Sequence, residues 1–488
     1  MNAQKTNQTD QLNQTDQTDQ TDQTEQPNRT GPPNRTVAIV DGYSTGNFLL
    51  PAFARLGVEA VHVQSTPELI APLAPPRLDA YRENLVCADP GTTARELARH
   101  RPLAVLAGAE FGVRLADELS ERLGLMTNGT RLSAARRDKF LMIEALRDAG
   151  IRCARQHRSA DPEELRAWAE REGIHPVVVK PISSSGADNV HICRDGEAVV
   201  RAARSVMSAR DLFQQPNTEA LAQSYLDGTE YVVDMACSQG ERYVCGVWEY
   251  RKRDIGAGRR IYDRDVLLDP GAAPVPELVA YVDTVLAALD IRHGAVHAEV
   301  IMTASGPVLV EIAARLNGGL NAGFQELCLG IDQSAATALA YARPAEFRQR
   351  YGGRTYTKLI EAFVHDTTTA LDGIVEGVDE AVVEEITALP TVRDLTVKYR
   401  PGRRMRPTVD LPSSPLTVYM ADEDPAALEA DCKAIGELKE RVYRLAPTVN
   451  AGRGGPPPPG GAAPPPPRGA GGAPLPPPGR GARGGKGR

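Results

Sequence analysis

Two glutamates near the middle of the chain, Glu299 and Glu311, have the spacing of a metal-binding pair. They lie in GAVHAEVIMTASGPVLVEIAARLNGG, where apolar runs flank a turn signal at Ser305-Gly306-Pro307. This pattern predicts two strands joined by a tight turn, and both glutamates are six residues from Ser305. They should therefore face each other, and opposed carboxylates favour a bridging Mg²⁺ or Mn²⁺ ion. The alternative is a solvated strand face with a different register.

Strand alternation puts further side chains beside this pair. His297 and Ala313 each lie two residues from one of the glutamates, and Arg315 follows if the second strand continues. His297 could act as a base, or it could be a structural histidine held by hydrogen bonds.

Two lysines that precede the glutamates could contact phosphate. Lys180 ends the apolar strand predicted in HPVVVKP, and Lys139 lies in the helix predicted in SAARRDKFLMIEALRDAG. After Lys180 comes a loop of small residues whose backbone N–H groups could cover phosphate oxygens, namely Ser183, Ser184, Ser185 and Gly186. A structural salt bridge for Lys180 and a surface position for Lys139 are the alternatives.

A strand that ends in Gln-Ser-Tyr-Leu could bind the base of a nucleotide. We expect an exposed strand edge for adenine at Gln223, Ser224, Tyr225 and Leu226. Glu230 follows the turn at Asp227-Gly228 and would offer a carboxylate to ribose hydroxyl groups. Taken alone, this segment is weak evidence.

Alternating strands and helices must position these residues. The N-terminal part begins with the apolar strand TVAIVDGY, a helical stretch through Leu56 and the strand VEAVHV. The strand PLAVLAG and a helix from Phe111 to Arg122 continue the alternation, which predicts a doubly wound sheet up to about Leu125. Beyond it, strands dominate as far as a helix expected near Leu278 to Leu289. The expected fold class is therefore α/β, with an α+β second part.

Composition marks two tails and the regions between them. Residues 1–35 form a polar NQTDQ-type repeat and residues 447–488 a basic Pro/Gly-rich segment, so both should be disordered. Between the tails we expect an α/β domain over 36–126, a nucleotide-binding region over 127–345 with a small central part at about 155–228, and a C-terminal part over 346–446. Within the last part, a compact stretch from about Ile386 to Leu445 should pack back on the body.

Charge and cysteine content exclude several classes of protein. A net charge of -7 over 488 residues gives no basic excess for nucleic acid or anionic lipid. The 7 cysteines are scattered, which favours reduced thiols in a cytoplasmic protein, and no apolar stretch is long enough for a membrane span. The sequence leaves a homo-oligomer open.

In combination, the order of these motifs resembles the ATP-grasp superfamily over roughly residues 36–446. The nucleotide site would lie between about 135 and 330. The segments AARRDKFLMIEALRDAGIR, VVVKPISSSG, YLDGTEYVVD and LVEIAARLNGG are most similar to its L-amino-acid ligase and carnosine-synthase-like branch. This resemblance implies an N-terminal doubly wound domain, a small central domain and a C-terminal domain, with ATP between the last two.

The resemblance also implies roles for single residues. Lys139 and Lys180 would contact ATP phosphates under the 183–186 loop, the 223–226 hinge would bind adenine, and Glu230 would bind ribose. Lys252 would approach the γ-phosphate, with Arg251 and Arg253 as competing candidates. Glu299 and Glu311 would bind two Mg²⁺ ions, although Ala313 stands where many members have a third ligand, Asn. Arg315 would hold the acyl phosphate or the substrate carboxylate, and Glu110 could bind a substrate ammonium group.

The implied reaction joins a carboxylate to an amine. ATP would convert the acid to an acyl phosphate with release of ADP, and an amine would then attack to give an amide and phosphate. The expected substrates are small carboxylates and amines, in particular amino acids. Alternatives are loading of an amino acid onto a carrier-protein thiol, activation of bicarbonate by a carboxylase, and a non-catalytic nucleotide-binding module. The pair of glutamates and the two lysines argue against the last.

Overall fold

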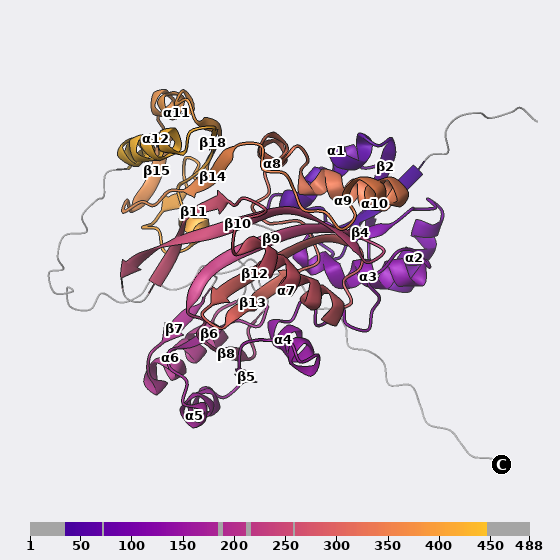
Figure 1. Ribbon diagram of the computed structural model, residues 1–488, viewed down its shortest axis with the longest axis horizontal. Coiled ribbons are helices and arrows are strands. Elements are labelled where there is room, and N and C mark those ends of the chain that lie inside the picture. The colour runs from indigo at the N-terminus through magenta and orange to yellow at the C-terminus, as the bar shows by residue number, and fades with distance from the viewer. Residues whose placement is uncertain (1–34, 71–72, 184–188, 211–215, 257–258, 447–488) are drawn as a thin grey trace, which may run out of the picture. The chain divides into compact units, whose positions relative to one another are not determined.

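The computed structural model describes residues 35–70, 73–183, 189–210, 216–256 and 259–446, and Figure 1 shows them as a ribbon. The described residues from Arg35 to Leu445 belong to one compact unit, and Ala446–Arg488 are a second unit of which only Ala446 is described. The domain boundaries expected at 126 and 345 stay predictions.

The N-terminal part is a parallel sheet with the strand order β3-β2-β1-β4. Its strands are β1 (Arg35–Val40), β2 (Val58–Gln64), β3 (Asn84–Val86) and β4 (Val105–Ala107). Val37 and Ile39 pack toward α1 (Leu49–Ala54), whereas Ala38 and Val40 share a core with α2 (Pro90–Ala98) and α3 (Val113–Arg122). Helices therefore cover both faces, which confirms the predicted doubly wound sheet. The short strand β3 was not predicted.

Asp-Pro pairs begin several of the helices. Asp89, Asp161 and Asp424 each accept a hydrogen bond from a backbone N–H in the first turn, and the proline that follows has the helical φ without needing a donor. They start α2, α5 (Pro162–Glu172) and α12 (Pro425–Leu438). Gly173, with φ of 62°, ends α5 in the left-handed conformation.

A second, antiparallel sheet forms the small central part, in the order β5-β8-β6-β7. Its strands are β5 (Gln156–Ser159), β6 (Val177–Lys180), β7 (His191–Cys193) and β8 (Ala220–Ser224). Helices α5 and α6 (Gly196–Ser208) pack on it around Trp168 and Val199 (Figure 1). Because β8 lies between β5 and β6, the exposed edge expected at Gln223 is wrong, and Gln223 is buried.

The largest sheet has eight strands in the order β13-β12-β9-β10-β11-β14-β18-β16. Their bounds are β9 (Gly228–Ser238), β10 (Glu241–Gly256), β11 (Arg259–Leu267), β12 (Gly294–Thr303), β13 (Gly306–Ala313), β14 (Glu361–Asp366), β16 (Val392–Val397) and β18 (Leu416–Asp422). Helix α7 (Val275–Ala288) contributes Leu278 and Val282 to its main core, as do α8 (Ala322–Leu329), α9 (Gln333–Ala342) and α10 (Pro344–Tyr351) through other apolar side chains.

The C-terminal stretch completes this sheet. Strands β14, β16 and β18 extend it, while β15 (Gly373–Val378), β17 (Arg404–Met405) and β19 (Tyr443–Leu445) form a small sheet of their own. Helices α11 (Glu380–Thr387) and α12 cover a core that contains Val418 and Ile435. The stretch from Ile386 thus packs on the body, as expected, partly by continuing its main sheet. Within the described ranges, no helix is long and apolar enough to cross a membrane.

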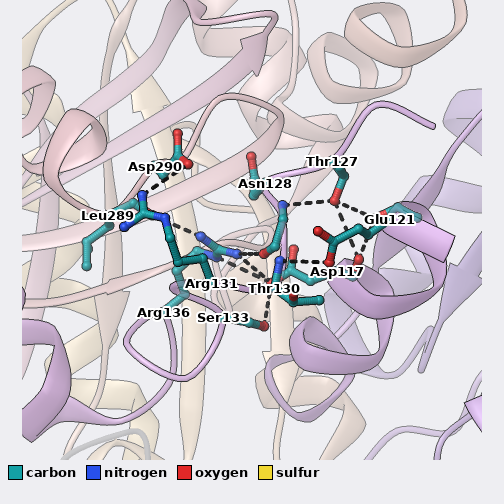
Figure 2. Close-up of polar contacts among 12 residues, drawn as sticks. Asp117, Glu121, Thr127, Asn128, Thr130, Arg131, Ser133, Arg136, Leu289 and Asp290 are labelled. Atoms are coloured by element: carbon teal, nitrogen blue, oxygen red, sulfur yellow. Dashed lines mark hydrogen bonds and ion pairs between the residues drawn. The ribbon is translucent and has the colours of Figure 1, made fainter. Parts of the chain in front are cut away.

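Helix α4 (Lys139–Asp148) is shorter than the helix predicted from Ser133. Asp138 ends the preceding turns and caps α4 by accepting hydrogen bonds from the N–H groups of its first turn. Within those turns the side chain of Arg136 is fully buried, and it bonds Asp117 of α3 at 2.9 Å and the carbonyl of Leu289 at 2.9 Å, as Figure 2 shows. This buried cation holds the segment to α3 and to the end of α7 and so fixes where Lys139 begins its helix.

Candidate active site

Glu299 of β12 and Glu311 of β13 lie directly opposite each other, as predicted from the hairpin. The route to this pairing differs from the expectation. Thr303 pairs with Gly306, so the turn is one residue tighter than a turn centred on Ser305, and a bulge between Glu299 and Val300 then restores the pairing. Without the bulge, Glu311 would face Ala298 and point to the other side of the sheet.

His297 lies beside the pair and is bonded through both ring nitrogens. Its Nδ1 is 2.8 Å from Oδ1 of Asp234 on β9, and its Nε2 is 3.4 Å from Oε1 of Glu299. Asn317 donates to the other oxygen of Asp234 at 2.8 Å. Burial lowers the pKa of His297, but the hydrogen bonds to Asp234 and Glu299 outweigh burial and raise the pKa to about 9. The imidazole therefore orients Glu299.

Lys139 and Lys180 both face the glutamates. The ammonium group of Lys139 lies 2.5 Å from Oε2 of Glu311. Burial would raise the pKa of Glu311, but Lys139 holds that pKa well below its usual value. Burial and the nearby Glu311 instead raise the pKa of Glu299. Burial and the charge of Lys139 lower the pKa of Lys180 to about 8.

Arg315 and Glu110 meet although they are far apart in the sequence. Nε of Arg315 donates to Oε2 of Glu110 at 2.9 Å, which joins the end of the β13 hairpin to the N-terminal sheet domain. Arg137 lies 3.7 Å from the other oxygen of Glu110 and donates to Ser183 at 3.5 Å. A carboxylate, Glu110, and a guanidinium group, Arg315, thus lie together beside the glutamate pair. A substrate that carries both an ammonium and a carboxylate group could replace their mutual ion pair with one ion pair to each.

Glu230 and Lys252, which were expected to bind different parts of ATP, form an ion pair with each other. Nζ of Lys252 lies 2.7 Å from Oε2 of Glu230 and 4.5 Å from the ring centre of Tyr262. The competing candidates are engaged elsewhere, since Arg251 pairs with Glu249 and Arg253 with Asp263. Of these three cations, Lys252 is the one directed at a predicted site residue.

The other residues predicted to bind the nucleotide differ in where the structure places them. Gln223 is buried and donates to Gln156, whose amide in turn donates to the carbonyl of Phe140 in α4, so it links the central sheet to the helix of Lys139. The N–H of Ser224 donates to the carbonyl of Arg155, and the N–H of Arg155 donates to Oγ of Ser224. Tyr225 and Leu226 follow the end of the strand. Three members of the expected phosphate loop, Ser184, Ser185 and Gly186, lie outside the described residues, and Ser183 is the described one.

Three residues of the site were missed from the sequence. Asp234 alternates with Glu230 along β9, and a charged residue inside the apolar run YVVDMAC was a usable signal. Arg137, next to Asp138, was hidden within the helix that was expected to start at Ser133. Asn317 lies beyond the strand, so no periodicity pointed to it.

The glutamate pair suits Mg²⁺ only when other ligands contribute. No group of three or more His, Cys, Asp or Glu side chains suited to a metal occurs in the part of the chain that the structure describes. The two opposed carboxylates, one with a raised pKa, are nevertheless hard oxygen donors whose repulsion a cation would relieve. Mg²⁺ is commonly held by one or two carboxylates together with substrate phosphates and water.

Comparisons with known proteins show which family and which solved structures this chain is similar to. The family described as the ATP-grasp domain matches residues 174–322. Dapdiamide A synthase of Enterobacter agglomerans is 34% identical over 421 residues, which cover 84% of this chain and 97% of that protein. The crystal structure of L-amino acid ligase from Bacillus licheniformis has 18% identity and a TM-score of 0.64, covering 85% of this chain and 98% of its own.

A second similar structure belongs to an enzyme of another activity. Carboxyaminoimidazole ribonucleotide synthase from Aspergillus clavatus, complexed with ATP, has 14% identity and a TM-score of 0.61, and the match covers 84% of this chain and 99% of that one. At such identity the likeness concerns the fold alone. The match to dapdiamide A synthase covers nearly the whole length of that protein. On this match the chain belongs to the ATP-grasp superfamily, and it is an ATP-dependent, ADP-forming ligase that makes an amide bond.

Proposed function

We propose that this ligase activates the carboxylate of one amino acid and joins it to the amino group of a second. The observation that carries the proposal is the pair Glu299 and Glu311 on one sheet face, with Lys139 and Arg315 beside it. The relatives named for dapdiamide A synthesis and for L-amino acid ligation support amino acids as the substrate class.

In this proposal Glu299 and Glu311 hold Mg²⁺, which would neutralise charge on the transferring phosphoryl group when bound. Lys139 would leave Glu311 for the phosphates of ATP, and Lys180 would contact them from the end of β6. His297 keeps Glu299 in position through its bond to Asp234. Glu230 would turn from Lys252 to the ribose hydroxyl groups, which frees Lys252 for the γ-phosphate.

Arg315 and Glu110 would bind the charged groups of the amino-acid substrates. The guanidinium group of Arg315 would hold the substrate carboxylate or the acyl phosphate, because it presents several donors in a planar array. Glu110 would accept a hydrogen bond from a substrate ammonium group. Their pairing at 2.9 Å keeps both charges compensated.

The amino-acid proposal is tested by measuring ADP release with pairs of free amino acids. Glu311→Gln should abolish ADP release while the circular dichroism spectrum is unchanged. Glu376→Gln, an exposed glutamate on β15, is the matched control and should retain full activity. A fully active Glu311→Gln enzyme would refute the metal role.

Two other substrates separate the proposal from its rivals, namely bicarbonate as the activated acid and a carrier-protein thiol as the acceptor. If bicarbonate rather than an amino acid stimulates ADP release, the enzyme is a carboxylase. If release requires a carrier protein, the acceptor is a thiol. Either result would overturn the dipeptide proposal without affecting the assignment to the superfamily.

A further inference from the structure

A cavity of about 290 Å³ lies on the large sheet next to the candidate site. It is bounded by side chains of β10, β11 and β14, by the 317–319 loop and by α8, with Trp248, Tyr250, Asp265, Asn317, Phe324 and Asp366 among its lining residues. Figure 1 shows β10, β11 and β14 running side by side beneath α8. None of the nucleotide or metal roles proposed above uses its walls.

The cavity opens on the same face of the sheet as the glutamate pair. Residues paired across neighbouring strands share a face, and Glu311, Glu299, Val232 and Trp248 form one such row. Trp248 is two strands from Glu299, which corresponds to roughly 10 Å at the usual strand spacing. Asn317 also links the two places, because it lines the cavity and bonds Asp234. A substrate held at the glutamates can therefore extend a side chain into the cavity.

Asp265 places a carboxyl group in this cavity, and one of its two oxygens has no hydrogen-bond partner among the described residues. Asp265 pairs with Tyr250 across the sheet, and this oxygen, Oδ1, is shielded from solvent. Asp366 in the same cavity is satisfied, since Lys398 lies 3.1 Å away and Thr417 donates at 2.6 Å. Burial, followed by the charges of Asp366 and Glu230, raises the pKa of Asp265 well above its usual value. A buried carboxylate of this kind is costly unless a cation joins it.

The other walls suit a cation as well. Trp248, Tyr250, Phe324 and Tyr419 supply aromatic rings, which attract ammonium and guanidinium groups through their faces. Lys398, the lysine in the lining, is already paired with Asp366, so the charge left for a ligand is negative. The volume is on the scale of one amino-acid side chain rather than of a whole peptide.

We infer that this cavity receives the positively charged side chain of one of the two substrates, a basic amino acid, and that Asp265 accepts its hydrogen bond. This inference rests on the proposed amino-acid ligase function. It adds a specificity-determining residue to that function.

The test compares basic amino acids with neutral ones of similar shape in the ADP-release assay. L-Arginine is paired with L-citrulline and L-lysine with L-norleucine, each offered with a set of neutral partner amino acids. The wild-type enzyme should favour the basic member by about 10- to 100-fold in kcat/KM, and Asp265→Asn should remove that preference. Activity with a neutral pair and KM for ATP should stay unchanged in Asp265→Asn. Asp372→Asn, an exposed aspartate, is the matched control.

Each outcome bears on one of the two proposals. Equal use of basic and neutral side chains, or an unchanged preference in Asp265→Asn, overturns the role of Asp265 while the ligase activity stands. Preference for L-citrulline over L-arginine that survives in Asp265→Asn also overturns it, because the carboxyl group would then act in its neutral form. If the enzyme releases no ADP with any pair of amino acids, the amino-acid proposal itself fails. Calorimetric titration with L-arginine then decides the cavity, since binding that Asp265→Asn weakens at least 10-fold supports the inference and equal binding overturns it.

Discussion

The buried ion pair between Arg136 and Asp117 should be one of the most sensitive points of the fold. Arg136 is 0% exposed and Asp117 8% exposed in their side chains. The guanidinium group also bonds the carbonyl of Leu289 at 2.9 Å and that of Gly129, and Ser133 donates to Asp117 at 2.6 Å (Figure 2). We predict that Arg136→Met destabilises the protein strongly, because it leaves a buried carboxylate and two carbonyls without their cation.

The expected cost follows from burial and charge. Removing one partner of a buried pair typically costs about 3–5 kcal/mol, because the remaining charge loses its compensation. Asp117 already has a raised pKa through burial, which Arg136 partly offsets. Without Arg136 its pKa should rise further, so the folded protein would hold this proton more tightly than the unfolded chain. The cost should therefore be largest at neutral pH and shrink as the pH falls toward about 5.

Chemical denaturation of wild type and variant at pH 7 and pH 5 measures this difference. Arg131→Met is the control, because Arg131 lies in the same segment but its side chain is 74% exposed and makes a long contact of 3.5 Å with Asp290. Its replacement should lower the free energy of unfolding by about 1 kcal/mol or less. The double variant Asp117→Leu/Arg136→Met should recover more than half of the loss. The reasoning is refuted if Arg136→Met costs no more than Arg131→Met, or if its cost is equal at both pH values.

Three further predictions concern the site. Because the charged form of Lys180 exists below its pKa of about 8, kcat/KM for ATP should fall as the pH rises from 7 to 9, and Lys180→Arg should remove that inflection in a pH-rate profile. Glu230→Gln should raise KM for ATP about 10-fold or more with less effect on kcat, as steady-state kinetics would show, and an unchanged KM would exclude a ribose contact. Arg315→Lys keeps the charge but loses the planar donors that reach Glu110, so KM for the activated acid should rise while KM for ATP stays constant. Equal effects on both KM values would contradict a substrate-specific role.

Local patterns were sufficient to predict much of the fold. The apolar run before Asp41 and the strand beginning at Val58 are recognisable because parallel strands buried on both faces have few polar residues. The helix start at Lys139 was not predictable from periodicity. Ser133 to Arg137 contain good helix formers, but the contacts of Arg136 with Asp117 and Leu289 hold them in turns. Tertiary contacts decided the local conformation there.

Contacts between distant segments were beyond prediction for a related reason. Glu110 and Arg315 are 205 positions apart, and their pairing depends on how the N-terminal sheet packs on the rest of the unit. Gln223 was expected at an edge, yet β5 covers it, because β5 comes from a segment 67 positions earlier. Periodicity indicates which face of a strand is buried, but it does not indicate which strands are neighbours.

The pairing of Glu299 with Glu311 was predicted correctly from a local pattern, although one detail of the hairpin was not predictable from it. Counting from the turn gave the correct partner for Glu299, yet the turn has a different length from the one assumed, and the bulge after Glu299 compensates by one residue. A bulge changes which face a side chain points to, and this one directs Glu311 to the face of His297 and Asp234. The correct pairing therefore arose from two deviations that cancel. The short turn is an ordinary hairpin connection, so the bulge is the feature that places Glu311 opposite Glu299, and bulges beside functional sites often redirect a side chain in this way.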